Sequence, residues 1–320
     1  MIWIMSLVMS IALANAAPKK SKGKAKAKQK TVDVNMTKVG TCAPELPAPN
    51  FGDQTGEIAS AAGMPKPEVK TVMVFKQWHL APTTVTKGFK EKYQQEKNQT
   101  AIYKKLSEMV KKQMLQVVVA EGCEGEIDGN FEPAFNGWKI KELEKQAQTK
   151  GFDKIITMVP MKLEARWGDK LVTLCGDDLK LIKESQMHLS NLRGWMGFWT
   201  RLNEAKPGDD KLKLYADAAA DLLKMPKDTP VEELKKKINE RSVEELQLFE
   251  QSLNDRNAAF VKAVQSRDYT NAAIVIGGLH AADLKSKLEK AGLNCNIYEP
   301  PGYSKQDETL IQDFAKSLKN

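Results

Sequence analysis

The sequence predicts an α/β protein: a central mixed, largely parallel sheet flanked by helices, with a helical insert. Short apolar runs alternate with an amphipathic helical pattern over residues 71–175, and the order strand, helix, strand favours a parallel sheet with a right-handed crossover. From about residue 178 to 266 the pattern is almost wholly helical. We therefore expect one α/β domain at residues 69–320, carrying a helical insert at about 178–240.

Four apolar runs and one amphipathic segment are the predicted elements in the first half of this domain. Residues 71–75 (TVMVF) form a short apolar run, which is typical of a strand buried on both faces, and residues 116–120 (QVVVA) are a second predicted strand. Between them, residues 98–114 place apolar side chains at helical spacing, with lysines on the opposite face. Residues 155–159 (IITMV) and 171–175 (LVTLC) are two further predicted strands.

Two helix starts are predicted inside the helical stretch. Residues 229–232 (TPVE) combine an N-cap threonine, a proline at the first helical position and a glutamate three residues after the cap. Residues 242–245 (SVEE) repeat this capping box without the proline, so a long helix is expected from about 243 to 266. The last three predicted elements are a strand, a helix and a strand at residues 272–276, 281–291 and 294–298.

Composition excludes two classes of protein. With 42% hydrophobic and 28% charged residues the chain is not disordered as a whole, and 320 residues can bury a sizeable core. The net charge of +8 comes mainly from seven lysines in residues 1–30, a segment that contains no acid. The rest of the chain has 42 basic and 41 acidic residues, so we expect no specific nucleic-acid partner.

The amino terminus predicts export. Residues 1–16 are continuously apolar and end in Ala14-Asn15-Ala16, the small-x-small pattern of a signal peptide, although a basic segment is missing. We expect cleavage before Ala17 and a periplasmic or secreted protein, or a membrane-anchored one if cleavage does not occur. Residues 17–68, rich in lysine and then in proline and glycine, are predicted to be a disordered tether or arm that contacts the anionic envelope weakly.

The four cysteines permit disulfides in an exported chain. Cys42, Cys123, Cys175 and Cys295 allow three pairings, and the sequence does not choose among them. The absence of any Cys-x-x-Cys spacing argues against a zinc knuckle or a thioredoxin-type redox pair.

Three polar side chains follow predicted strands, where ligands gather in open α/β sheets. His79 lies beyond the first strand, Glu121 directly follows the second, and His280 closes the segment Gly277-Gly-Leu-His280. Each residue alone is more often a capping or packing residue, but two imidazoles and one carboxylate at strand ends favour a functional site. The third histidine, His188, lies in the helical stretch and is expected to be structural.

These motifs resemble the TraB/TIKI/ChaN/erythromycin-esterase-like superfamily, which is marked by two Gly-x-x-His motifs, a strand-end glutamate and an Arg-Asn pair in a long helix. Gly277-Gly-Leu-His280 matches the second motif, Glu121 the glutamate, and Arg256-Asn257 the helical pair. Residues 175–178 (CGDD) are similar to the Gly-x-Glu-Asp stretch of the superfamily. The resemblance covers roughly residues 70–300, and it depends on the order and spacing of the motifs.

The first motif departs from the superfamily pattern. It is usually Gly-Glu-x-His, whereas this chain has Lys76-Gln77-Trp78-His79. Gln77 cannot take a proton and is a poor ligand for a hard cation, so either another acid serves or the chemistry is lost. Glu124 and Glu126 lie close to Glu121 in sequence, but a solvated acidic turn is their expected role.

The resemblance implies a metal-assisted hydrolase of a peptide, amide or ester bond in a peptide or small molecule. His79, Glu121 and His280 would hold one divalent ion such as zinc, manganese or cobalt. Arg256 would stabilise an oxyanion or orient Glu121, and Gln77 would position substrate or water. In a metal-free variant, His79 would be a general base toward water.

The alternative is a catalytically inactive relative in the cell envelope that binds haem, iron or another small ligand. Two histidines close to a carboxylate favour the hydrolase, whereas a wide apolar cleft with an unpaired histidine favours binding. The sequence leaves the oligomeric state open.

Overall fold

The computed structural model describes residues 36–42, 70–79, 90–131, 139–206, 208–305 and 308–318. The predicted signal peptide and most of the predicted tether lie outside these residues. Among the described helices, none combines the length and apolar character needed to cross a membrane.

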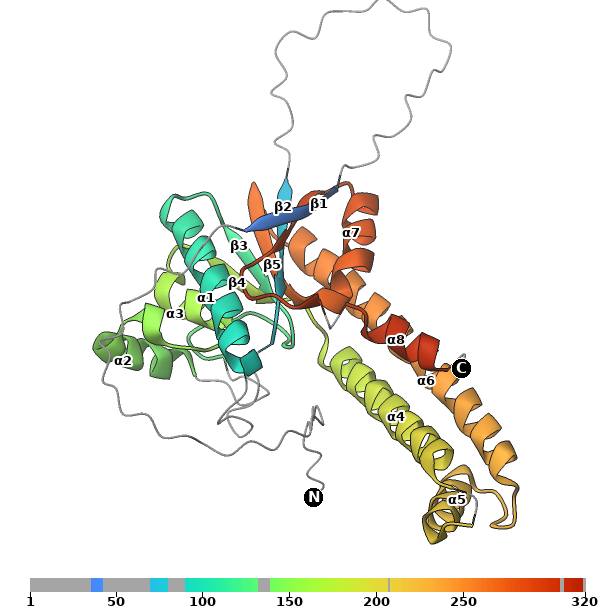
Figure 1. Cartoon of the computed structure of the whole chain (residues 1–320). Helices are drawn as coiled ribbons and strands as arrows, with labels where there is room; N and C mark the ends of the chain where they lie inside the picture. The colour runs from blue at the N-terminus through green and yellow to red at the C-terminus, as the bar shows by residue number, and fades with distance from the viewer. Residues whose placement is uncertain are drawn as a thin grey trace, which may run out of the picture. The chain divides into compact units, whose positions relative to one another are not determined.

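A six-stranded sheet forms the centre of the described chain (Figure 1), in the order β1-β6-β2-β5-β3-β4. The strands are β1 (Thr37–Cys42), β2 (Thr71–Gln77), β3 (Val117–Ala120), β4 (Val172–Cys175), β5 (Asn271–Gly277) and β6 (Asn294–Glu299). All neighbours are parallel except β1 and β6, which are antiparallel. The predicted fold class, a mixed and largely parallel α/β sheet, is confirmed.

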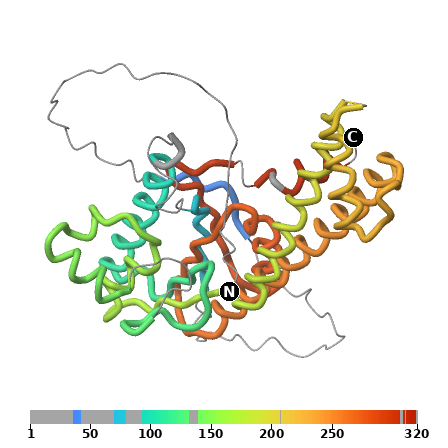
Figure 2. The backbone as a smooth tube through the Cα atoms, turned by 90° about the horizontal axis from the view of Figure 1, so that it is seen from below, coloured from blue at the N-terminus to red at the C-terminus, as the bar shows by residue number. Residues whose placement is uncertain are grey.

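Eight α-helices accompany the sheet in the described residues. They are α1 (Lys90–Lys111), α2 (Ile140–Lys150), α3 (Val159–Trp167), α4 (Leu179–Glu204), α5 (Asp210–Leu223), α6 (Val231–Gln265), α7 (Ala281–Lys290) and α8 (Leu310–Ser317). Figure 2 shows the helices seen along another direction.

Both faces of the sheet are apolar, which explains why its central strands are continuous apolar runs. Val74 and Ile274 pack with Phe260 of α6 and Leu284 of α7 on one face. On the other face, neighbouring strand residues such as Phe75 pack with residues of α1 and α3. The sheet is thus covered by helices on both sides, and its strand ends are left to carry polar groups.

The insert is a set of packed helices with its own apolar cluster. Leu202 of α4, Ala219 of α5, and Leu234 and Ile238 of α6 are buried together. Helix α6 then continues into the domain, where its last turns contact the sheet. The chain enters the insert through α4, just after β4, and returns to the sheet through α6, and Figure 1 shows these two helices side by side.

The second predicted helix start is wrong. Helix α6 runs without a break from Val231, and Ser242 lies inside it, where its Oγ donates to the carbonyl oxygen of Ile238. The apolar stripe that includes Leu234 and Leu246 is buried on both sides of Ser242, so packing outweighs the local capping signal. A helix does start within residues 229–232, but its N-cap is Pro230 and not Thr229, and no side chain caps it.

The predicted strand at residues 155–159 is also wrong. Residues 155–158 connect to helix α3, which begins at Val159 with Pro160 in its first turn. A short apolar run does not distinguish a strand from a buried helical segment, and proline at this position favours a helix. Ile155 is buried in a cluster with Ile140 and Leu143 of α2.

Six residues of the predicted disordered tether are ordered. Strand β1 pairs with β6, and a disulfide joins Cys42 at its end to Cys295. The prediction of disorder is therefore wrong for residues 37–42. The strand pairing and the disulfide that order them involve residues far away in sequence, which a local sequence pattern does not reveal. The second disulfide joins Cys123 to Cys175.

Candidate functional site

Glu121 lies at the carboxyl ends of three adjacent parallel strands. It directly follows β3, and the register places the end of β3 beside β5 and the end of β5 beside β2. Its side chain is only 8% exposed. The strand-end position predicted for Glu121 is thus observed, beside the ends of β5 and β2.

Five nitrogen atoms, each from a different residue, surround the Glu121 carboxylate. On Oε2 they are Nε2 of His79 at 3.3 Å, Nε2 of Gln77 at 3.2 Å and the backbone nitrogen of Gly277 at 2.6 Å. On Oε1 they are Nε2 of His280 at 3.3 Å and Nη2 of Arg256 at 3.2 Å. All five predicted site residues are thus brought together.

Glu121 is held as an anion. Burial opposes its ionisation, but the charges and hydrogen bonds of His79 and His280 outweigh burial and hold its pKa well below the usual range. Burial also opposes the charge of Arg256, yet Asp177 and Glu121 raise the pKa of that guanidinium. The centre of the site is an ionised carboxylate among cationic and polar donors.

His280 is buried, and its tautomer follows from its neighbours. Asn257 donates from Nδ2 to Oδ2 of Asp283 at 2.8 Å, so its Oδ1 faces Nδ1 of His280, also at 2.8 Å. Nδ1 of His280 must therefore carry a proton to donate. Nε2 then faces Glu121 with a lone pair, which requires a cation between them, or with a second proton.

The donor set fits a divalent metal ion in its chemistry. Two imidazoles and one carboxylate are ligands of zinc-type ions, and a ligand histidine usually donates its other nitrogen to a neighbour such as Asn257. Each imidazole contacts a different oxygen of Glu121, both at 3.3 Å. In the described part of the chain, no group of three His, Cys, Asp or Glu side chains is arranged so that it could hold a metal ion.

His79 is the accessible member of the group. Its side chain is 53% exposed, whereas that of His280 is 3% exposed. Gly277 lets it approach, because a Cβ added there would lie 3.1 Å from Nε2 of His79 and 3.3 Å from Oε2 of Glu121. Gln77 is buried, donates to Glu121 and accepts a hydrogen bond from Gln99, so it contacts protein groups on both sides of its amide.

Other sequence candidates lie outside this group. Glu124 and Glu126 are exposed, and Glu126 pairs with Arg267. His188 of α4 contacts Glu245 of α6 at 2.7 Å, within the insert.

Asp177 was not predicted as a site residue, although it binds Arg256 directly. It lies just beyond β4, so the strand-end rule that found Glu121 also applies to it.

No family model, curated protein or solved structure matches this chain. Membership of the TraB/TIKI-like superfamily is therefore our proposal. It depends on the residues described above and on their order along the chain.

Proposed function

We propose that this chain is an exported, metal-assisted hydrolase that acts on a peptide, amide or ester bond of a peptide or small molecule. The observation that supports this most is that the ionised carboxylate of Glu121 contacts Nε2 of both His79 and His280. The proton on Nδ1 of His280 leaves its Nε2 suited to a cation. A site built only for packing has no need of two imidazoles on one buried carboxylate.

His79, Glu121 and His280 would hold the divalent ion. When bound, such an ion lowers the pKa of a water ligand to about 7 and polarises a carbonyl group. Zinc, manganese and cobalt all suit this mixture of nitrogen and oxygen donors.

The remaining residues position Glu121. Arg256 donates to Oε1, Gln77 and the backbone of Gly277 donate to Oε2, and together they fix the orientation of the carboxylate. Arg256 therefore fits the orienting role expected for it. Gln77 orients Glu121 in this arrangement, rather than substrate or water.

A metal-free form of the same activity uses His79 as the general base. The contact with Glu121 fixes one ring nitrogen as a donor, so the other carries the lone pair that accepts a proton from water. The exposure of His79 gives this imidazole access to solvent.

The test is a hydrolysis panel of chromogenic esters, acyl amides and short peptides. Purified protein would be assayed after chelation and after addition of zinc, manganese or cobalt. His79→Gln should lower the rate by about 10² to 10⁴-fold, while His188→Gln, the matched control, should keep it. Loss on chelation indicates the metal-assisted form, and retained activity indicates the metal-free form. Equal rates for the two variants, or no hydrolysis of any substrate, would contradict the proposal.

Small-ligand binding is the second candidate, because a pocket of about 580 Å³ lies in the insert. Its apolar lining comes from residues such as Trp195, Leu222 and Met225, and its charged lining includes both Arg241 and Glu245. This mixture suits an amphipathic small molecule. Titration with haem and with a fatty acid, compared between the native chain and Trp195→Ala, tests this function separately from hydrolysis.

We also propose export, supported by the two disulfides, since such bonds persist in oxidising compartments. Mass analysis of protein from the envelope or medium should show a chain that begins at Ala17. An intact amino terminus would indicate an anchored form.

A further inference from the structure

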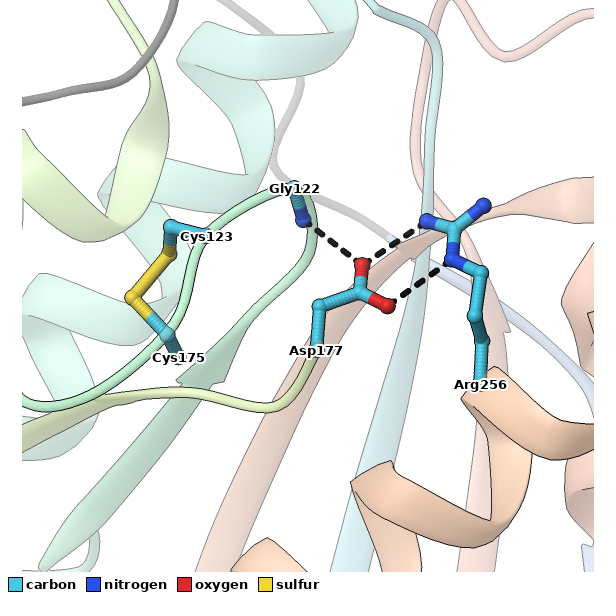
Figure 3. The surroundings of a disulfide bond; sticks show 5 residues. All are labelled: Gly122, Cys123, Cys175, Asp177 and Arg256. Atoms are coloured by element: carbon cyan, nitrogen blue, oxygen red, sulfur yellow. Dashed lines mark hydrogen bonds and ion pairs between the residues drawn. A yellow bond between two sulfur atoms is a disulfide. The ribbon is translucent and has the colours of Figure 1, made fainter. Parts of the chain in front are cut away.

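Asp177 is a fully buried carboxylate beside the Glu121 site. Its side chain is 0% exposed. It accepts hydrogen bonds from Nε and Nη2 of Arg256, both at 2.8 Å, and from the backbone nitrogen of Gly122 at 2.9 Å. Figure 3 shows the Asp177 carboxylate between the loop that carries Gly122 and the guanidinium. Asp177 therefore connects the loop after β3 to helix α6.

The two bonds to Asp177 fix the rotation of the Arg256 side chain. A guanidinium is planar, and two of its nitrogen atoms match the two oxygens of a carboxylate. With Nε and Nη2 on Asp177, Nη2 also faces Oε1 of Glu121 at 3.2 Å. Without Asp177, Arg256 would be able to turn and bind Glu121 through two nitrogens, in competition with His280 for Oε1.

A disulfide next to these carboxylates joins the loop after β3 to the last residue of β4. Cys123 lies two residues after Glu121, and Cys175 lies two residues before Asp177. The backbone nitrogen of Cys175 also donates to the carbonyl oxygen of Gly125 at 2.7 Å. Figure 3 shows the disulfide near the hydrogen bond from the Gly122 backbone nitrogen to Asp177. The cross-link thus restricts the distance between Glu121 and Asp177.

We infer that Asp177 and the Cys123–Cys175 disulfide form one positioning clamp, which holds Arg256 so that Glu121 stays directed at both imidazoles. The inference rests on the proposed hydrolytic function and assigns these residues a task within it. Asp177 acts through Arg256, so it is a positioning residue. The Cys42–Cys295 disulfide, at the opposite edge of the sheet, has no such task.

The chain offers a matched control for the disulfide. Cys42 and Cys295 are 253 residues apart, whereas Cys123 and Cys175 are 52 apart, so the chain-entropy model predicts a larger stability loss for Cys42→Ala/Cys295→Ala. The loss of activity, in contrast, should be larger for Cys123→Ala/Cys175→Ala than for Cys42→Ala/Cys295→Ala. Cys123→Ala/Cys175→Ala should lower kcat by about 10- to 100-fold with KM unchanged, because small displacements of a catalytic group have effects of this size. Equal kcat values for the two variants would overturn the inference.

Asp177→Asn provides a second variant and a readout that does not need turnover. It keeps the side-chain shape but removes the charge that holds Arg256. We expect a kcat loss of about 10-fold or more and changed ring-nitrogen NMR signals of His79 and His280, with His188 unaffected. If the native chain hydrolyses nothing, the proposed function fails, while the clamp is still judged by NMR. Unchanged imidazole signals in both Asp177→Asn and Cys123→Ala/Cys175→Ala would overturn the clamp. Signals that shift in these two variants but not in Cys42→Ala/Cys295→Ala would support it.

Discussion

Nε2 of Gln77 lies 3.2 Å from Oε2 of Glu121, so a neutral amide occupies the position where the superfamily resemblance expects a carboxylate. Both side chains are buried. The amide donates a hydrogen bond that a carboxylate cannot donate, and this stabilises the ionised form of Glu121 without a metal ion. Residue 77 is therefore the position at which a carboxylate should be restored.

Gln77→Glu should make folding depend on a divalent ion. A second carboxylate against Glu121 brings two negative charges together, which lowers stability in the presence of a chelator. Zinc, manganese or cobalt should restore it, because an ion that binds only the folded state raises the free energy of unfolding. Thermal unfolding with and without each metal provides the measurement.

Gln77→Met is the matched control, since it removes the amide without adding charge. It should lower stability and show no greater metal response than the native chain. If none of the metals stabilises Gln77→Glu, the imidazoles of His79 and His280 do not bind a metal ion together with Glu121.

Gly277→Ala should lower activity with little loss of stability. The added methyl group would lie 3.1 Å from Nε2 of His79, and the half-exposed imidazole has room to move away from Glu121. A kcat loss of about 10- to 100-fold is expected from such a displacement. Gly197→Ala, whose added methyl group meets no atom within 4 Å, serves as the control. Full activity of Gly277→Ala would show that the His79 contact is dispensable.

Lys162 predicts a pH dependence of stability that is separate from the site. Its Nζ donates to the carbonyl oxygen of Ile155 at 2.8 Å, and burial lowers its pKa to about 8. In the unfolded chain the pKa of Lys162 is near 10.5, so between pH 8 and 10.5 the unfolded state binds more protons at Lys162 than the folded state does. The contribution of Lys162 to the free energy of unfolding therefore rises as the pH increases from 8 to 10.5. Relative to Lys162→Met, the native chain should gain on the order of 3 kcal/mol over this range.

Urea unfolding of both proteins from pH 7 to 10.5 measures this difference. Lys150→Met, a change at an exposed lysine, is the matched control. A pH-independent difference for Lys162→Met would mean that Lys162 stays charged in the folded protein.

The five strands other than β1, and the sheet edge that carries the site, were predictable because their signals are local. Runs such as residues 71–75 are apolar throughout since both faces of the sheet are covered. His79, Glu121 and His280 each follow a strand, and parallel strands bring their carboxyl ends to one edge. Sequence position was therefore enough to group them.

Long-range pairing was not predictable in the same way. Strand β1 depends on β6 and on the Cys42–Cys295 disulfide, which join residues 253 positions apart. The capping signal at Ser242 is overridden by packing along α6, which only the tertiary structure reveals. Asp177 lies in the CGDD stretch that the resemblance included, but it was not predicted as a site residue, because its partner Arg256 lies 79 positions away.

The most direct test of the account is the NMR spectrum of the imidazole nitrogens, because the chain has only three histidines. Glu121→Gln should shift the ring signals of His79 and His280 together and leave His188 unchanged, while Glu245→Gln should shift His188 alone. If Glu121→Gln shifts only one imidazole, or none, the two histidines do not meet on this carboxylate and the proposed site does not exist.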